Sequence, residues 1–154
     1  MTEEIKSSGL RHQSRLEAVK ALYSGEINEK SDSSKSPETL ALEIISLHQD
    51  AIDDKKTIDE DFVTKIIIGV CTNKTTLDEK IEKHLGESWK LNRLGPVLHC
   101  ILRAGVFELL HFNDTPLKVI INEYVNVTRG FYDEKEVGFV NGILDKIGHE
   151  TRDE

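Results

Sequence analysis

Residues 96–111 read Pro-Val-Leu-His-Cys-Ile-Leu-Arg-Ala-Gly-Val-Phe-Glu-Leu-Leu-His. Proline suits the first turn of a helix, because the N–H that it lacks would have no partner there. The large apolar residues of this stretch leave little polar face: Val97, Leu98, Ile101, Leu102, Val106, Phe107, Leu109 and Leu110. A helix that is apolar nearly all round is usually the buried centre of a bundle. We therefore expect an all-α fold whose core is centred on residues 97–110.

Arg103 is the exception inside this apolar stretch. A buried charge without a partner costs several kcal/mol, so a buried arginine requires a carboxylate. Glu123 and Asp145, on the last two expected helices, are the candidates. We expect Arg103 to be buried, paired with one of them, and structural rather than catalytic.

Helical periodicity also dominates upstream, and no alternating strand pattern persists. The pattern predicts a helix over 10–27, a polar linker over 28–36, a helix over 37–49 and a long helix over 57–86. Ser36 and Pro37 provide a cap and a first-turn proline for the second helix. Thr57 and Glu60 have the spacing of a capping box at the start of the long one.

Downstream, a connection that carries Trp89 precedes the central helix, and two further helices follow it. One is expected from Pro116 to Gly130, and the last begins after the cap Asp133 and ends at Gly148. The prediction is thus a compact all-α bundle of about seven helices in two subdomains of three to four helices. We expect a flexible arm over 1–9, a single domain over 10–150 and a flexible tail over 151–154.

The composition is that of a globular protein, with 38% hydrophobic and 31% charged residues in 154. This length is enough for one domain with a core. No apolar run approaches the roughly 20 residues that a membrane span needs, and the first residues lack the apolar segment of a signal peptide. We expect a cytoplasmic protein without membrane association.

Motifs of catalysis are absent from the sequence. Cys71 and Cys100 each lie alone in an apolar helical pattern, which predicts buried free thiols rather than a disulfide or a metal site. The six histidines have no metal-ligand spacing, and neither a glycine-rich phosphate loop nor a nucleophile elbow occurs. We expect neither an enzyme nor a bound cofactor.

The net charge of −8 is distributed unevenly. Residues 28–61 contain ten acidic and four basic residues, whereas residues 10–25 are net positive. In that basic segment Arg11 and Arg15 lie four residues apart and share a helix face beside His12, with Glu17 nearly opposite. Guanidinium groups bind phosphates and stack on bases, so this face is either a contact for single-stranded RNA or a solvated surface.

Residues 137–146, Val-Gly-Phe-Val-Asn-Gly-Ile-Leu-Asp-Lys, place Asn141 and Gly142 inside a helical pattern. Glycine inside a helix costs up to about 1 kcal/mol, so the pair is expected either where another segment approaches the backbone closely or where the amide satisfies a buried polar group. Together with Ala18–Tyr23, Ile101–Leu109 and Thr115–Glu123, and in the same order, this run resembles the NusB family of bacterial transcription antitermination factors. The resemblance extends over about residues 11–147.

The resemblance implies a non-catalytic adaptor that binds boxA-type single-stranded RNA together with NusE, a small-subunit ribosomal protein. It further implies action on the elongating RNA polymerase with NusA and NusG, notably on ribosomal RNA operons. The RNA-binding residues implied are Lys6, Arg11, His12, Gln13, Arg15, Arg129, Phe131 and Lys135. Those implied for the protein partner are Tyr23, Asn92, Leu98 and His99.

Several of these positions depart from the family pattern. His12 and Gln13 stand where arginine is common, which thins the basic patch and predicts weak or pH-sensitive RNA binding. The family often has acidic residues around positions 92–99, and this chain does not. Phe131 can equally stack on a base or anchor the core, and Phe139 is expected in the core.

Two other functions remain open. One is a protein-binding helical module without RNA contact. The other is the NusB-like domain of a ribosomal RNA cytosine methyltransferase, which would continue into a Rossmann-like domain that these 154 residues do not include. A monomer and a homodimer are both compatible with the sequence, and a homodimer that paired through the RNA-binding face would be autoinhibited.

Overall fold

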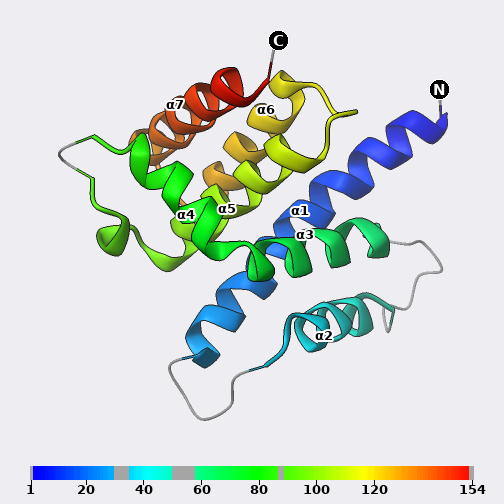
Figure 1. Ribbon diagram of the computed structural model, residues 1–154. Coiled ribbons are helices and arrows are strands. Elements are labelled where there is room, and N and C mark those ends of the chain that lie inside the picture. Colours follow the sequence, from blue (N-terminus) through cyan, green and yellow to red (C-terminus); the bar gives the residue numbers. More distant parts are fainter. Residues whose placement is uncertain (1, 30–34, 50–57, 87–88, 153–154) are drawn as a thin grey trace. The chain divides into compact units, whose positions relative to one another are not determined.

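The structure is a computed structural model that describes residues 2–29, 35–49, 58–86 and 89–152, with the side chains of 2–9, 28–29 and 49 left out. Within these ranges the chain forms seven α-helices and one 3₁₀ helix, and no strand (Figure 1). The expected all-α fold of about seven helices is therefore confirmed. The chain divides into two compact units, residues 1–71 and 72–154, which are described separately below.

The first unit contains α1 (Thr2–Glu29), α2 (Pro37–Gln49) and most of α3 (Glu60–Thr72). α2 packs against α1, and Gly25 lets them approach, since a Cβ there would lie 2.7 Å from Cδ1 of Leu40. α1 begins at Thr2, eight residues before the expected start at Leu10, and α2 has the expected bounds. Apolar side chains from all three helices form the core: Ala18, Val19, Leu22, Leu40, Ala41, Phe62, Val63, Ile66 and Ile67.

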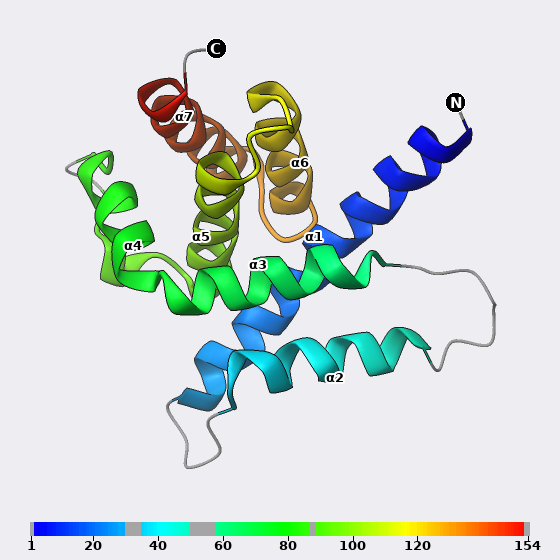
Figure 2. The same cartoon turned by 45° about the vertical axis from the view of Figure 1, so that its right-hand side comes forward.

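The second unit contains α4 (Lys74–Lys83), a 3₁₀ turn η1 (Leu91–Arg93), α5 (Pro96–His111), α6 (Leu117–Arg129) and α7 (Glu134–Thr151). Helices α5, α6 and α7 pack on one another, and α4 packs on α5 (Figure 2). Nearly every side chain of α5 from Leu98 to Leu109 is buried. The expected central helix is confirmed with its expected bounds. None of the helices described is long and apolar enough to cross a membrane.

The single long helix expected over 57–86 is wrong, because the chain leaves helical geometry at Asn73 and starts again as α4. Asn73, with φ −122° and ψ 20°, lies in a run of threonine and asparagine, whose helix propensities are poor. The start of α3 also differs from the expected capping box. Phe62 donates its N–H to Oδ1 of Asp59 at 3.2 Å, so Asp59 acts as the cap. Thr57 lies outside the described residues.

Two glycine expectations are wrong. Gly142 has open space where a Cβ would be, so no close approach explains it. Asn141 is exposed and lines a pocket of about 470 Å³ between α6 and α7. Gly148 does not end the last helix, which continues to Thr151. Gly148 instead allows close packing, since a Cβ there would lie 2.1 Å from Cδ1 of Leu117.

Arg103 is buried, as expected, but its partner is not on the last two helices. Its Nε donates to Oδ1 of Asp78 at 2.9 Å and its Nη2 to Oδ2 at 2.7 Å. Asp78 lies on α4, so the expected pairing with Glu123 or Asp145 is wrong. The reason is that the face of α5 that carries Arg103 packs against α4 rather than against α6 or α7.

A flexible tail was expected over 151–154, of which the structure describes Thr151 and Arg152. Thr151 belongs to α7, and Arg152 is fixed by its guanidinium. That group donates to four backbone carbonyls: those of Glu108, Leu109, Phe112 and Thr115, at 2.6 to 3.3 Å. Arg152 thereby binds carbonyls at the end of α5 and in the following turn, of which those of Glu108 and Phe112 also accept a backbone N–H. Residues 153–154 lie outside the description.

Candidate nucleic-acid interface

The basic residues expected to contact RNA begin on α1, and they are less exposed than expected. Arg15 is only 3% exposed, and Arg11, His12 and Gln13 are half-buried. A solvated surface, one of the two expectations for the face of Arg11 and Arg15, is therefore wrong for Arg15. Lys6 lies on α1 as well, but its side chain is outside the description.

Both arginines lie against the ring of Phe62, on α3. Cζ of Arg11 is 4.9 Å from the ring centroid, and Cζ of Arg15 is 5.1 Å from it. A guanidinium at this distance is attracted by the negative face of an aromatic ring, more strongly where water is excluded. Phe62 is itself buried. Sequence reasoning missed this contact, because nothing in the sequence places α3 beside the basic turn of α1.

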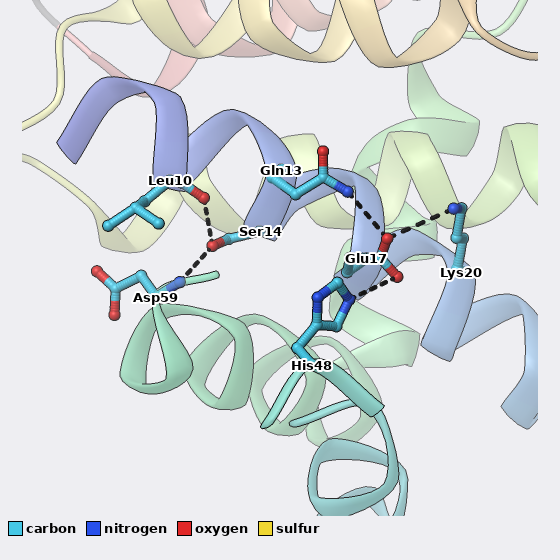
Figure 3. Close-up of polar contacts among 7 residues, drawn as sticks. All are labelled: Leu10, Gln13, Ser14, Glu17, Lys20, His48 and Asp59. Carbon is cyan, nitrogen blue, oxygen red and sulfur yellow. Dashed lines mark hydrogen bonds and ion pairs between the residues drawn. The ribbon is translucent and has the colours of Figure 1, made fainter. Parts of the chain in front are cut away.

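Ser14 connects the same two helices. Its Oγ donates to the carbonyl of Leu10 and accepts the N–H of Asp59 at 2.7 Å (Figure 3). Asp59 caps α3, and Phe62 follows three residues later, so this bond fixes the start of α3 on α1 at the level of the arginines. Ser14 is fully buried. It is a site residue that sequence reasoning missed.

Glu17 is the centre of a polar cluster rather than a solvated residue on the far side of α1. It is buried, and its Oε1 accepts hydrogen bonds from Nε2 of Gln13 at 3.0 Å and from Nζ of Lys20 at 3.4 Å. Nε2 of His48, on α2, lies 3.5 Å from its Oε2 (Figure 3). Gln13 is thus held by Glu17, which leaves its amide less available to RNA.

The second group of expected RNA-binding residues lies in the other unit. Phe131 is 41% exposed, in the turn after α6, so of its two expected roles the structure favours the surface one. Arg129 is exposed, with Nη1 donating to Oδ1 of Asn126 at 3.1 Å and Nε lying 3.8 Å from Oε1 of Glu134. These contacts are on the surface and weak. Both side chains can therefore reorient toward a ligand.

Lys135 belongs to an aromatic stack. Its Nζ lies 5.4 Å from the ring centroid of Trp89, and Trp89 stacks on Phe139 with centroids 4.1 Å apart and planes 18° apart. Phe139 is half-buried, so the expectation of a core residue is wrong in part. Trp89 was not expected here, although a tryptophan in a connecting segment is a signal that could have found it. Stacked rings beside a cation are chemistry that holds nucleobases.

The residues expected to face a protein partner also fall in both units. Tyr23 is half-buried on α1, and Asn92 is exposed on η1. Leu98 is 2% exposed, which contradicts its expected place on the surface, and its N–H donates to Oη of Tyr132 at 3.2 Å. His99 is half-buried, with Nε2 2.7 Å from Oδ1 of Asp78. Its imidazole is therefore engaged within the unit.

Asp78 is the most perturbed acid in the part of the chain that the structure describes. Its burial would raise the pKa, but the hydrogen bonds from Arg103 and His99 outweigh this and hold the pKa of Asp78 well below its usual range. A permanently charged Asp78 makes this cluster a structural clamp between α4 and α5. Among the described residues no group of histidine, cysteine and acidic side chains could hold a metal ion. Cys100 is buried as expected, whereas Cys71 is half-buried.

Comparison with known proteins gives the context for this geometry. A sequence model described as the NusB family matches residues 12–149. A Rhizobium etli protein called transcription antitermination protein NusB is 35% identical over an alignment of 157 positions, which covers 97% of this chain and 92% of that one. A Caulobacter vibrioides protein of the same name is 43% identical over 95 residues, 62% of this chain and 64% of that one.

A solved structure extends the likeness to three dimensions. The crystal structure of antitermination factors NusB and NusE in complex with dsRNA contains a chain that superposes with a TM-score of 0.74. That chain is 26% identical in sequence, and the match covers 92% of this chain and 97% of that one. The residues discussed above therefore lie on a fold that has been seen with a protein partner and RNA.

Proposed function

This chain belongs to the NusB family, and from that premise we propose that it is a transcription antitermination factor that binds RNA and NusE together. It is a non-catalytic adaptor. Its RNA is of the boxA type, and the joint complex acts on the elongating RNA polymerase with NusA and NusG, notably on ribosomal RNA operons in the cytoplasm. The solved complex of NusB, NusE and dsRNA supports the two partners.

The observation that carries the RNA part of the proposal is the half-exposed guanidinium of Arg11 on the basic turn of α1. Its guanidinium lies against the ring of Phe62, and its terminal nitrogens can form the paired bonds that phosphate oxygens accept. In the other unit Arg129, Phe131 and Lys135 supply two cations and an exposed ring, which suits backbone contact and base stacking.

The need for NusE follows from how few cations are available. Arg15 is buried and Gln13 is held by Glu17, so the first unit offers Arg11 and His12 as its main described contacts. RNA affinity grows with the number of phosphates neutralised. A short set of contacts binds weakly alone, and a second protein on the same RNA raises the effective concentration of each contact.

The test is the titration of fluorescent boxA-type RNA with the chain and NusE at two salt concentrations. Arg11→Ala should weaken binding by about 1–2 kcal/mol, the scale of a charge-assisted hydrogen bond, and should flatten the salt dependence. Lys146→Ala is the matched control, because it removes one exposed charge from α7, outside every proposed contact. Equal binding by wild type and Arg11→Ala at both salt concentrations would contradict the RNA contact.

The burial of Arg15 also favours a second candidate, the helical module that binds protein without RNA. In that case the chain would bind NusE with unchanged affinity whether or not boxA RNA is present. The same titration therefore separates the two candidates. A double-stranded RNA of matched sequence, included as a second probe, tests whether the single-stranded form is preferred.

A further inference from the structure

Arg11 and Arg15 have different surroundings although both contact one ring. Arg15 is almost wholly buried, whereas Arg11 keeps part of its side chain in water. Nε of Arg11 is itself buried and has no hydrogen-bond partner within the described residues. The inner part of the Arg11 guanidinium thus faces protein, and only its outer part can reach a ligand.

We infer that Phe62 is a positioning residue for RNA binding, which holds the guanidinium of Arg11 in the orientation that contacts phosphate. The inference rests on the proposed function. It assigns different roles to two arginines that the sequence treats alike, since Arg11 touches the RNA and Arg15 does not.

The electrostatics of the pair support these roles. Two guanidinium groups four residues apart on one helix face repel each other. Here each lies about 5 Å from the same ring centroid, so the negative face of the ring offsets part of that repulsion. Because Phe62 is 3% exposed, water does not screen this attraction fully. An aliphatic side chain of similar volume would fill the space but would not attract the guanidinium groups.

The position of the ring is fixed independently of the arginines. Asp59 binds Ser14 through its N–H and caps α3 through its carboxylate, which sets the start of α3 on α1. Phe62 follows on the first turn of α3. A guanidinium held in this way has lost its rotamer freedom before the RNA arrives, so binding costs less entropy than with a free arginine.

Fluorinated phenylalanine at position 62 tests the inference, because fluorine weakens the negative face of the ring while nearly preserving its shape. We expect RNA affinity in the NusE complex to fall stepwise with fluorination, by about three- to tenfold for the pentafluoro side chain, the range of a cation–π contact. The RNA affinity of Phe62→Leu should be reduced at least as much as that of the pentafluoro variant. Phe62→Tyr, which keeps an electron-rich ring, should retain most of the wild-type affinity. Pentafluorophenylalanine at Phe107, a buried ring of the other unit, is the matched control and should leave affinity unchanged.

A second readout needs no RNA. Relaxation of the Nε–Hε group of Arg11, measured by NMR on the free protein, should show greater mobility in the pentafluoro-Phe62 variant than in the wild type. Unchanged mobility, or affinity that does not follow fluorination while Arg11→Ala still weakens binding, would overturn the positioning role and leave the proposed function intact. If the wild type binds no RNA with NusE, the proposed function fails, and the Arg11 mobility still decides whether Phe62 orders the arginine.

Discussion

Asp78→Asn is the substitution whose effect the structure determines most directly. Asp78 accepts two hydrogen bonds from the guanidinium of Arg103, at 2.9 and 2.7 Å, and lies 2.7 Å from the imidazole of His99. Asparagine keeps the shape of the side chain but removes its negative charge. Arg103, which is 7% exposed, then stays in the core and loses the negative charge that accepts both bonds.

The free energy of unfolding should fall by about 3 kcal/mol. Breaking one partner of a buried ion pair costs about 3–5 kcal/mol, and the lower end applies because the Asp78 side chain is 21% exposed and water can partly replace it. Arg103→Met removes the buried positive charge, so the double variant Asp78→Asn/Arg103→Met should be more stable than Asp78→Asn alone. That difference measures what the buried guanidinium costs once the charge of Asp78 is gone.

The assay is urea unfolding near neutral pH, followed by circular dichroism and by the fluorescence of Trp89, the one tryptophan of the chain. Trp89 stacks on Phe139 in the same unit as the ion pair, so its signal reports that unit. A loss below about 0.5 kcal/mol, the scale of an ordinary surface substitution, would refute the reasoning. A double variant no more stable than Asp78→Asn would refute the cause assigned to it.

Three further predictions concern stability. Because the pKa of Asp78 is lowered in the folded state, the stabilisation from its charge is complete above the unfolded pKa of about 4 and is lost as pH falls below it. The stability of Asp78→Asn should therefore depend less on pH than that of the wild type. Circular dichroism from neutral to strongly acidic solution measures this. Gly148→Ala places a Cβ 2.1 Å from Cδ1 of Leu117 and should lower the free energy of unfolding by about 1–3 kcal/mol, as measured by urea unfolding. In the control Gly142→Ala the Cβ meets open space, and the same assay should show a gain of up to about 1 kcal/mol. Arg152→Met removes the guanidinium from four carbonyl oxygens, of which those of Glu108 and Phe112 keep a backbone N–H donor. The variant should lower the thermal midpoint by several degrees in calorimetry, and an unchanged midpoint would show that water replaces the guanidinium at no cost.

The helices of the second half could be predicted closely because their signals are strong and local. Pro96 marks the start of α5, and the apolar run after it has no polar face to confuse the period. Asp133 occupies the expected N-cap position of α7, but its side chain makes no capping hydrogen bond. In these segments propensity, periodicity and tertiary burial agree, and the sequence therefore predicts the bounds and burial of α5 and the start of α7.

The break at Asn73 and the continuation through Gly148 could not be predicted, because each depends on a difference of about 1 kcal/mol that tertiary packing decides. A glycine near the end of a helix has the same appearance whether it terminates the helix or admits a neighbouring side chain. Gly148 does the second, for Leu117. Asn73 interrupts a periodic apolar pattern that continues on both sides.

The site was predicted in part, and the failures have a common cause. Arg11 and Arg15 were placed correctly on one face of α1, but the sequence does not show which helix covers that face. α3 covers it through Phe62, which buries Arg15. Arg103 was correctly expected to be buried, yet the identity of its partner depended on α4 packing against α5. The apolar periodicity of a helix predicts which of its faces is buried, but it does not show which other helix packs on that face.

The measurement that tests the central claim most directly is the coupling between the two proposed partners. The affinity of the chain for boxA-type RNA is measured with and without saturating NusE, and its affinity for NusE with and without saturating RNA. We expect NusE to raise RNA affinity by about tenfold or more, and RNA to raise NusE affinity by the same factor, since linkage is reciprocal. Affinities for each partner that do not change when the other is present would contradict an adaptor that binds RNA and NusE jointly.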